Sequence, residues 1–439
     1  MSSELVARLR SEVAGGLARS TNADLDAAAR RDLAQRLLAT KFEELARHQL
    51  TVGQVPMRSD EEDGIARAVL DALFGLGRLQ QFIDDPDVEN IDVNGADQVW
   101  VTYFDGTKEM VGPAAGSDNE LVETIRGAAS RFGLSERRFD TAHPELDLRL
   151  PDGSRLSALM EVSARPALSI RRHRFVDLSL GDLVDMGLCN EGLASLLGAA
   201  VKARKNVVVA GSMNAGKTTL VRALASEIPP EERIVTIEQA FELALDTMPE
   251  RHRDIVALEA REANAEGEGE ITMARLVRRA LRMNAERVIV GEVLGAEVIP
   301  MLNAMSQGRS GSMCTIHADS SAGVFRRIAS YAVQAPERLP LEATNLLVAG
   351  SIHLVVFLDL AAPSPAPGAL AHPAARTRVI SSVREVVDAE GIQVVSNEVF
   401  RPGPDRRAQP AAPLRTRTLE ELTSHGYRFV GRQMEGACW

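Results

Sequence analysis

The residues with the clearest chemical potential form a glycine-rich segment near the middle of the chain. They fit the pattern GxxxxGK[ST] and stand between a β-branched run, 206–210, and a predicted helix, 218–228. Glycines let backbone N–H groups turn inward around a polyphosphate at a helix N-terminus, where the helix dipole favours negative charge. In this pattern the lysine neutralises the β- and γ-phosphates, and the following hydroxyl ligates Mg²⁺. The predicted phosphate-binding residues are Gly211, Ser212, Met213, Asn214, Ala215, Gly216, Lys217, Thr218 and Thr219.

Two glutamates follow predicted strands downstream of this loop. Glu292 ends the run that begins with the apolar residues 288–290, and Glu238 follows the run 234–237. A phosphate-binding enzyme needs such an acid to organise Mg²⁺ or to polarise water. We therefore predict Glu292 and Glu238 as catalytic residues, and Glu292 with Thr218 as the metal ligands. Without the phosphate loop, either glutamate is more simply a helix cap or part of a solvated turn.

A histidine, His317, follows a segment interrupted by Gly308 and Gly311. The two glycines are expected to let the backbone approach a ligand closely. A single histidine is more often a packing residue, so its interpretation as a functional residue depends on the wider pattern.

The composition narrows the class of partner. The chain has 439 residues, with 50 Lys and Arg against 61 Asp and Glu, so the net charge is −11, and aromatic residues make up 4%. Proteins that bind duplex DNA or single strands rely on basic surfaces and aromatic stacking, so no direct nucleic-acid partner is expected. Only five of the cationic residues are lysines. The lysine of the GxxxxGK[ST] pattern, Lys217, is therefore harder to explain by chance.

The three cysteines are far apart, and no uninterrupted apolar run is long enough to cross a membrane. The cysteine pattern fits a reducing compartment and offers no zinc site, so a cytoplasmic location is expected.

Changes in periodicity divide the chain into six regions. Short alternating strands follow an initial helical part, and alternating strands and helices then predict an α/β fold with a parallel sheet. A proline-rich stretch precedes a predicted β-hairpin. The predicted regions are a helical part (1–83), an α+β domain (84–173), a linker (174–187), the domain with the phosphate loop (188–360), a Pro/Ala-rich linker (361–378), and the hairpin with a tail (379–439).

Six motifs together resemble the secretion ATPases of type II and type IV systems. They are GSMNAGKTTL, ERIVTIEQAFEL, LRMNAERVIVGEV, GRSGSMCTIHADS, LPDGSR and SIRRHRF, and the resemblance covers about residues 65–405. The sequence is most similar to the CpaF-type branch, which drives tight-adherence pili. This resemblance implies a hexameric ATP-hydrolysing motor with a RecA-like P-loop domain, bound to inner-membrane platform proteins and peripheral at the cytoplasmic face of the membrane.

The resemblance also implies roles for individual residues. The glycine-rich segment becomes the Walker A motif, Glu238 and Glu242 lie in the Asp box, Glu292 is the Walker B acid, and His317 is the His-box histidine. Arg155 and Arg171 match arginines of the N-terminal domain that approach the nucleotide; without the family they are more simply solvated surface charges.

Several positions depart from the family pattern. Ser212 to Ala215 replace the usual residues of the Walker A loop, Gln239 stands for the usual Asp of the Asp box, and Gly291 stands where many Walker B motifs have Asp. Arg309 and Ser310 occupy the places of the usual His and Asp of the His box. These changes support an alternative, in which the chain is a structural or regulatory subunit that binds ATP and hydrolyses it weakly. A DNA-translocating motor is a third, weaker interpretation.

Overall fold

The structure is a computed structural model that describes residues 2–19, 26–132, 138–172, 177–261, 263, 267–308, 310–361 and 377–428. The chain forms two compact units, Met1–Arg174 and Phe175–Trp439. Arg309, most of the Pro/Ala-rich linker and the end of the predicted tail lie outside the described residues.

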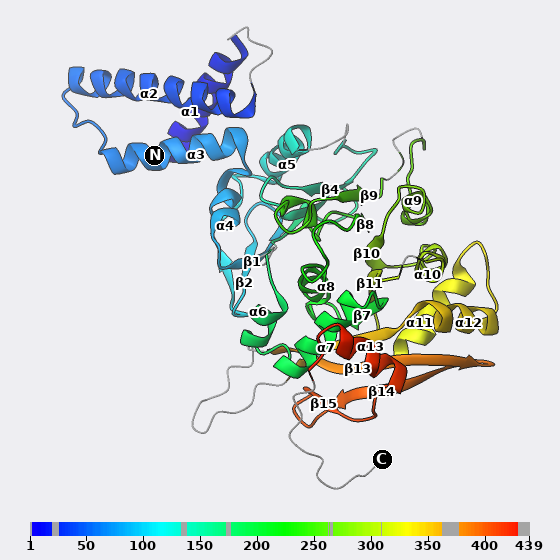
Figure 1. Ribbon diagram of the computed structural model, residues 1–439. Helices are drawn as coiled ribbons and strands as arrows, with labels where there is room; N and C mark the ends of the chain where they lie inside the picture. The colour runs from blue at the N-terminus through cyan, green and yellow to red at the C-terminus, as the bar shows by residue number, and fades with distance from the viewer. Residues whose placement is uncertain are drawn as a thin grey trace. The chain divides into compact units, whose positions relative to one another are not determined.

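The first unit begins with three helices, α1 (Ser2–Arg19), α2 (Ala27–Thr51) and α3 (Ser59–Phe74) (Figure 1). Their apolar faces share a small core whose buried members include Leu9, Leu38, Phe42, Val69 and Leu70. The side chain of Asp26 starts α2 by accepting a hydrogen bond from the backbone N–H of Ala29 at 2.7 Å, which satisfies one of the N–H groups that a helix start leaves unpaired. All three helices lie within the region 1–83 that the sequence predicted to be helical.

The rest of the first unit is built on a six-stranded antiparallel sheet of order β3-β2-β1-β6-β5-β4. Helix α5 packs on this sheet through Leu121, Ile125 and Ala128, which recur at helical spacing and are all buried. The elements are η1 (Gly77–Leu79), α4 (Gln80–Asp84), β1 (Val88–Asn94), β2 (Val99–Tyr103), β3 (Lys108–Val111), α5 (Asp118–Phe132), β4 (Glu145–Arg149), β5 (Arg155–Leu159) and β6 (Ala167–Arg171).

The second unit is built on a nine-stranded sheet of order β15-β14-β13-β12-β7-β11-β10-β8-β9. The six strands β12, β7, β11, β10, β8 and β9 run parallel to one another. The other three, β13, β14 and β15, each pair antiparallel with the strand before them in the chain. The strands are β7 (Val207–Gly211), β8 (Ile234–Glu238), β9 (Ile255–Glu259), β10 (Arg287–Val293), β11 (Met313–His317), β12 (Leu354–Ala361), β13 (Thr377–Glu390), β14 (Gln393–Pro402) and β15 (Ala408–Pro410).

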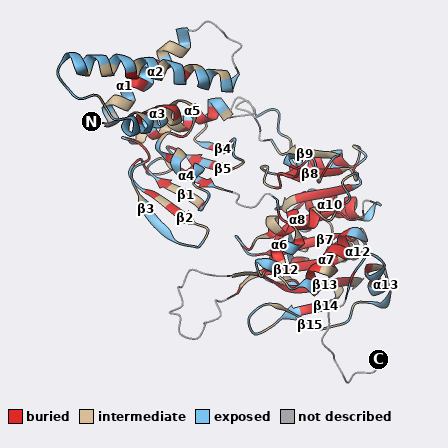
Figure 2. Cartoon of the chain, turned by 60° about the vertical axis from the view of Figure 1, so that its left-hand side comes forward, coloured by how far each residue is buried: buried red, intermediate tan, exposed pale blue. Residues whose placement is uncertain are grey.

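Helices cover both faces of this sheet, so its central strands are buried on both sides (Figure 2). Val207 and Val209 of β7 belong to one core, and Val208 and Ala210 belong to the other. Double burial explains why β7 is an unbroken apolar run, and the α/β fold class is confirmed. The helices are α6 (Leu180–Asp185), α7 (Glu191–Lys202), α8 (Lys217–Ala225), η2 (Leu245–Thr247), α9 (Met273–Ala280), α10 (Val298–Ser306), α11 (Gly323–Gln334), α12 (Leu341–Ser351) and α13 (Thr416–Ser424).

The hairpin of β13 and β14 extends the same sheet, because β13 pairs with β12 along the whole length of β12. Leu422 of α13 and Tyr427 are buried in the core that contains Val207, so the region after residue 379 contributes to the packing of the second unit. None of the helices that the structure describes is long and apolar enough to cross a membrane.

Candidate functional site

The phosphate loop connects β7 to α8 at the carboxyl edge of the parallel sheet. Asn214 has a φ of 60° and Gly216 a φ of 90°, so both adopt left-handed backbone conformations. Gly211 has no room for a side chain, because a Cβ there would lie 2.7 Å from the carbonyl oxygen of Leu358 on β12. The loop therefore needs glycine at Gly211 for space and at Gly216 for conformation, and asparagine is among the residues that tolerate a positive φ.

Lys217, the first residue of α8, is only 8% exposed. Its Nζ donates to the carbonyl oxygen of Ser212 at 3.0 Å and lies 3.4 Å from that of Gly211. The same ammonium lies 3.2 Å from Nδ1 of His317. The ammonium is thus held between the first carbonyl groups of the loop and the imidazole of His317.

His317 connects this lysine to Glu292. The two residues end or nearly end the adjacent strands β11 and β10, and Nε2 of His317 lies 2.8 Å from Oε1 of Glu292. An ammonium has only donors, so Nδ1 of His317 accepts from Lys217, and the ring hydrogen on Nε2 is donated to Glu292. Both side chains are about one third exposed, at 33% and 34%. We call Lys217, His317 and Glu292 the relay.

Glu238 lies in a different environment from Glu292. It is 3% exposed, and its Oε1 accepts hydrogen bonds from the backbone N–H groups of Glu242 at 2.9 Å and Leu243 at 2.8 Å. Burial raises the pKa of Glu238 to about 7, although these two hydrogen bonds oppose the shift. The geometry favours a role for Glu238 in fixing the loop that follows β8.

That loop lies against the phosphate loop. Thr218 Oγ1 donates to Oε2 of Glu242 at 3.4 Å. Arg222 of α8, which is 4% exposed, donates through Nε to the carbonyl oxygen of Leu243 at 3.1 Å and through Nη2 to that of Glu242. Arg222 was not identified from the sequence. The only sign of its role was a cationic residue at a position of α8 that faces the core.

The glycine in place of the usual Walker B aspartate has a structural reason. A Cβ at Gly291 would lie 2.9 Å from Cγ and 3.2 Å from Oε1 of Glu238. Because β10 and β8 are neighbours, the buried side chain of Glu238 occupies the space that a side chain at Gly291 would need. The departure at Gly291 is therefore matched by the position of Glu238.

The residues near Thr218 suit a cation that is bound mainly through a nucleotide. No group of three or more His, Cys, Asp or Glu side chains within the described ranges is arranged to hold a metal ion. Mg²⁺ is usually bound by one or two protein oxygens together with phosphate oxygens and water, so it does not require such a cage. The Thr218 hydroxyl and the carboxylates of Glu292 and Glu242 are oxygen ligands of the required type.

Arg155 and Arg171 lie in the first unit, directly opposite each other on the paired strands β5 and β6. Arg149 of β4 lies opposite Arg155 in turn, so three arginines occupy one row across three strands. Arg155 Nη2 lies 3.8 Å from Asp147 Oδ2. Arg149 was not identified from the sequence. Its position opposite Arg155 could have been inferred by pairing the two strands that flank the turn at 151–153.

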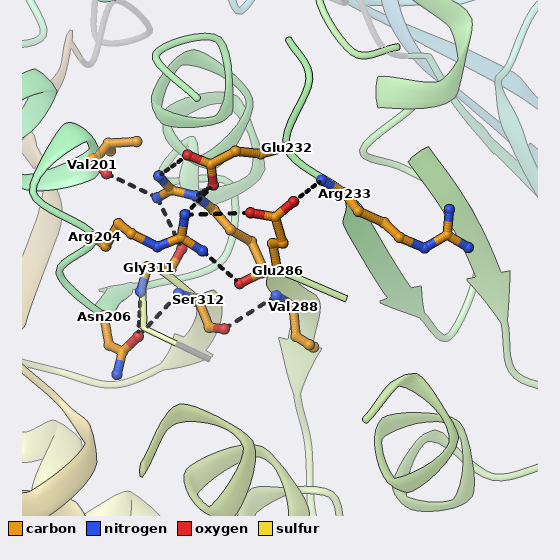
Figure 3. Close-up of polar contacts among 10 residues, drawn as sticks. Val201, Arg204, Asn206, Glu232, Arg233, Glu286, Val288, Gly311 and Ser312 are labelled. Atoms are coloured by element: carbon orange, nitrogen blue, oxygen red, sulfur yellow. Dashed lines mark hydrogen bonds and ion pairs between the residues drawn. The ribbon is translucent and has the colours of Figure 1, made fainter. Parts of the chain in front are cut away.

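In the second unit, a second polar network, which is buried, lies at the amino edge of the parallel strands (Figure 3). Arg287, the first residue of β10, has a side chain with 0% exposure, and its Nε and Nη2 donate to Glu232 at 2.7 and 3.1 Å. Its Nη1 donates to the carbonyl oxygen of Val201 at 2.8 Å. Burial alone would raise the pKa of Glu232, but the hydrogen bonds and charge of Arg287, together with the charge of Arg204, lower it.

Asn206 extends this network to β11 and α12. Its Oδ1 accepts from the N–H groups of Gly311 at 2.8 Å and Ser312 at 3.0 Å, and its Nδ2 donates to the carbonyl oxygens of Met305 and Ser351. A Cβ at Gly311 would lie 2.5 Å from Nη1 of Arg287. The expectation that Gly311 lets the backbone approach a ligand is therefore wrong, because this glycine makes room for a buried arginine.

Comparisons with known proteins show the family to which this sequence is related and proteins of similar fold. The sequence model of the family described as type II/IV secretion system protein matches residues 73–380. A putative conjugal transfer protein of Mycobacterium tuberculosis is 35% identical over 271 residues, which cover 60% of this chain and 74% of that protein. The type IV secretion system protein PtlH of Bordetella pertussis is 30% identical over 311 residues, covering 65% of this chain and 89% of that protein. The X-ray structure of the ATPase DotB of Legionella pneumophila has 18% identity and a TM-score of 0.50, and the match covers 72% of this chain and 80% of that one.

Proposed function

This chain belongs to the type II/IV secretion system protein family, and we propose that it is the hexameric, Mg²⁺-dependent motor of a secretion or tight-adherence-type pilus assembly system. It is an ATPase with a RecA-like P-loop domain. The observation that carries the proposal is the relay, which connects the phosphate-loop lysine to the acid at the end of β10 through one histidine.

The relay gives each residue a defined task during hydrolysis. Lys217 exchanges the carbonyl oxygens of the loop and Nδ1 of His317 for the β- and γ-phosphates, where its charge stabilises the transferring phosphoryl group. Glu292 orients the attacking water and accepts its proton. Mg²⁺, when bound, neutralises charge on the phosphate oxygens.

His317 reports that the phosphates of a nucleotide are bound. Its Nδ1 loses the lysine as a donor when Lys217 turns to the phosphates, so the ring is free to bond elsewhere while Nε2 keeps its contact with Glu292. The arginine row of Arg149, Arg155 and Arg171 provides positive charge in the first unit for binding a polyphosphate. Movement of the two units during the cycle would then do mechanical work on membrane partners at the cytoplasmic face.

The test is ATP turnover of the purified chain, measured together with its oligomeric mass, for wild type, Lys217→Ala and Glu292→Gln. We expect Mg²⁺-dependent turnover by a six-subunit species, and at least about a 100-fold loss in both variants. Turnover that survives Lys217→Ala would refute the assignment of the site. Tight binding of ATP by wild type without turnover, with membrane partners present, would favour the weakly hydrolysing subunit instead.

A further inference from the structure

Arg378 lies beside the phosphate loop although it is far from it in sequence. It is the second residue of β13, and it pairs in register with Leu360 of β12. Leu358, two residues earlier on β12, pairs with Gly211 at the end of β7. The antiparallel return of the chain therefore brings Arg378 to the edge of the sheet where the phosphate loop begins.

A hydrogen bond and a close approach connect this arginine to the loop. Its Nε donates a hydrogen bond to the carbonyl oxygen of Asn214 at 2.9 Å. Its Cδ would lie 3.4 Å from a Cβ placed on Gly216, so the aliphatic part of the side chain passes close to the last glycine of the loop. Asn214 and Gly216 are the two loop residues with a positive φ.

The direction of the loop's peptide groups gives this contact its importance. A loop that turns its N–H groups inward toward phosphate must direct carbonyl oxygens elsewhere, and those oxygens need donors. Lys217 serves the carbonyl oxygens of Ser212 and Gly211, and Arg378 serves that of Asn214. When phosphate arrives, the ammonium of Lys217 is needed by the nucleotide, whereas the bond from Arg378 uses no group that the phosphates require.

We propose that Arg378 is a positioning residue of the nucleotide site, which holds the phosphate loop in its binding conformation through the carbonyl oxygen of Asn214. This inference rests on the proposed function and adds a residue of β13 to the site. A residue that shapes the loop acts on the β-phosphate, which ADP and ATP share. Its loss weakens the binding of both nucleotides by the same factor and leaves the rate of the bound complex nearly unchanged.

The test compares wild type, Arg378→Ala and Arg378→Lys, with Arg406→Ala as the matched control. Arg406 pairs with Asp359 of β12 at 2.9 Å on the exposed surface, so the control removes an arginine that also contacts β12. Calorimetric titration with Mg²⁺ and either ADP or a non-hydrolysable ATP analogue gives Kd, and steady-state turnover gives kcat and KM. Thermal melting of the nucleotide-free chains reports on folding.

We expect Arg378→Ala to weaken both nucleotides about tenfold, with kcat within about twofold of wild type and an unchanged melting temperature. Arg378→Lys should recover part of the affinity, and Arg406→Ala should match wild type. Unchanged affinity in Arg378→Ala would overturn the inference, and so would a loss confined to the ATP analogue, which would indicate direct contact with the γ-phosphate. If wild type binds neither nucleotide, the proposed function fails and the inference fails with it. If wild type binds nucleotide and Arg378→Ala binds it equally well, only the inference fails.

Discussion

At the amino edge of the parallel sheet, Arg287 is fully buried and bonds to Glu232 and to the carbonyl oxygen of Val201. At the carboxyl edge, His317 and Glu292 remain one third exposed, and Lys217 bonds to carbonyl oxygens of its own loop. The two groups of polar residues occupy opposite ends of the same strands, β10 and β11.

The amino edge holds polar groups that complete the fold, whereas the carboxyl edge holds the polar groups that we propose receive a ligand. A buried charge is tolerated only when it is paired and hydrogen-bonded, and the amino edge meets this condition with groups of the protein. The carboxyl edge holds a cation, a histidine and a carboxylate close together where water has access. We therefore expect changes at the amino edge to lower stability first, and changes at the carboxyl edge to lower activity first.

The largest effect is expected from Arg287→Ala. The change removes the donors to Glu232, Val201 and Gly311 and leaves a cavity in a fully buried place. Breaking such a pair costs about 3–5 kcal/mol in free energy of unfolding, which urea unfolding followed by circular dichroism measures. Arg204 also pairs with Glu232, at 2.8 Å, but its side chain is 37% exposed whereas that of Arg287 is fully buried. Arg204→Ala is therefore the control and should cost less free energy of unfolding. A stable Arg287→Ala chain without activity would contradict the division between the two edges.

Glu292→Gln should do the opposite at the carboxyl edge. The amide cannot accept a proton from water, so kcat should fall by about 100-fold or more, while the free energy of unfolding changes by less than about 1 kcal/mol. The two quantities are measured on the same preparation by turnover and by urea unfolding. A loss of stability comparable to that of Arg287→Ala would show that Glu292 is part of the folded framework.

A pH dependence is expected from His353, which precedes β12 at the amino edge. Its Nδ1 accepts from the backbone N–H of Asn206 at 2.9 Å, and burial, together with the charge of Lys205, lowers the pKa of His353 to about 4. The unfolded chain, with an ordinary histidine pKa near 6.5, binds more protons than the folded chain between these values, so stability falls as the pH drops from 6.5 toward 4.

Between pH 7 and pH 5 this histidine should account for a loss of about 2 kcal/mol. Urea unfolding at the two pH values measures the loss. His353→Asn keeps a side-chain acceptor and removes the titration, so its loss over the same interval should be smaller by that amount. Equal losses in the two chains would mean that His353 is not protonated on unfolding in this range.

The smallest effect is expected from Ser312→Ala. Ser312 Oγ accepts from the backbone N–H of Val288 at 3.1 Å inside the amino edge, and the alanine would leave that N–H without this partner. We expect a loss of about 1 kcal/mol in stability with kcat unchanged. Thr315→Val, which removes the donor to the carbonyl oxygen of Gly291 on the same pair of strands, is the matched change closer to the relay and should alter kcat as well.

Features defined by short stretches of sequence could be predicted. The phosphate loop, the strand before it and the helix after it are neighbours along the chain, so their residue types alone indicate the structure. The same holds for the strands ending near Glu238 and Glu292 and for the hairpin of β13 and β14. Arg287 could not be recognised, because arginine is nearly always at the surface unless a partner is buried with it, and Glu232 is 55 residues away in the chain.

The sequence by itself determined which residues form the glycine-rich loop predicted to bind phosphate and which carboxylates follow strands, since those properties depend on local spacing. The tertiary structure alone decided that Lys217 meets His317 across 100 residues, that Gly291 leaves room for Glu238, and that Arg378 reaches Asn214 across 164 residues. The physical reason is the strand order. Strand β7 lies between β11 and β12, and strand β8 lies beside β10. Side chains at the ends of neighbouring strands then lie within bonding distance whatever their separation in the chain.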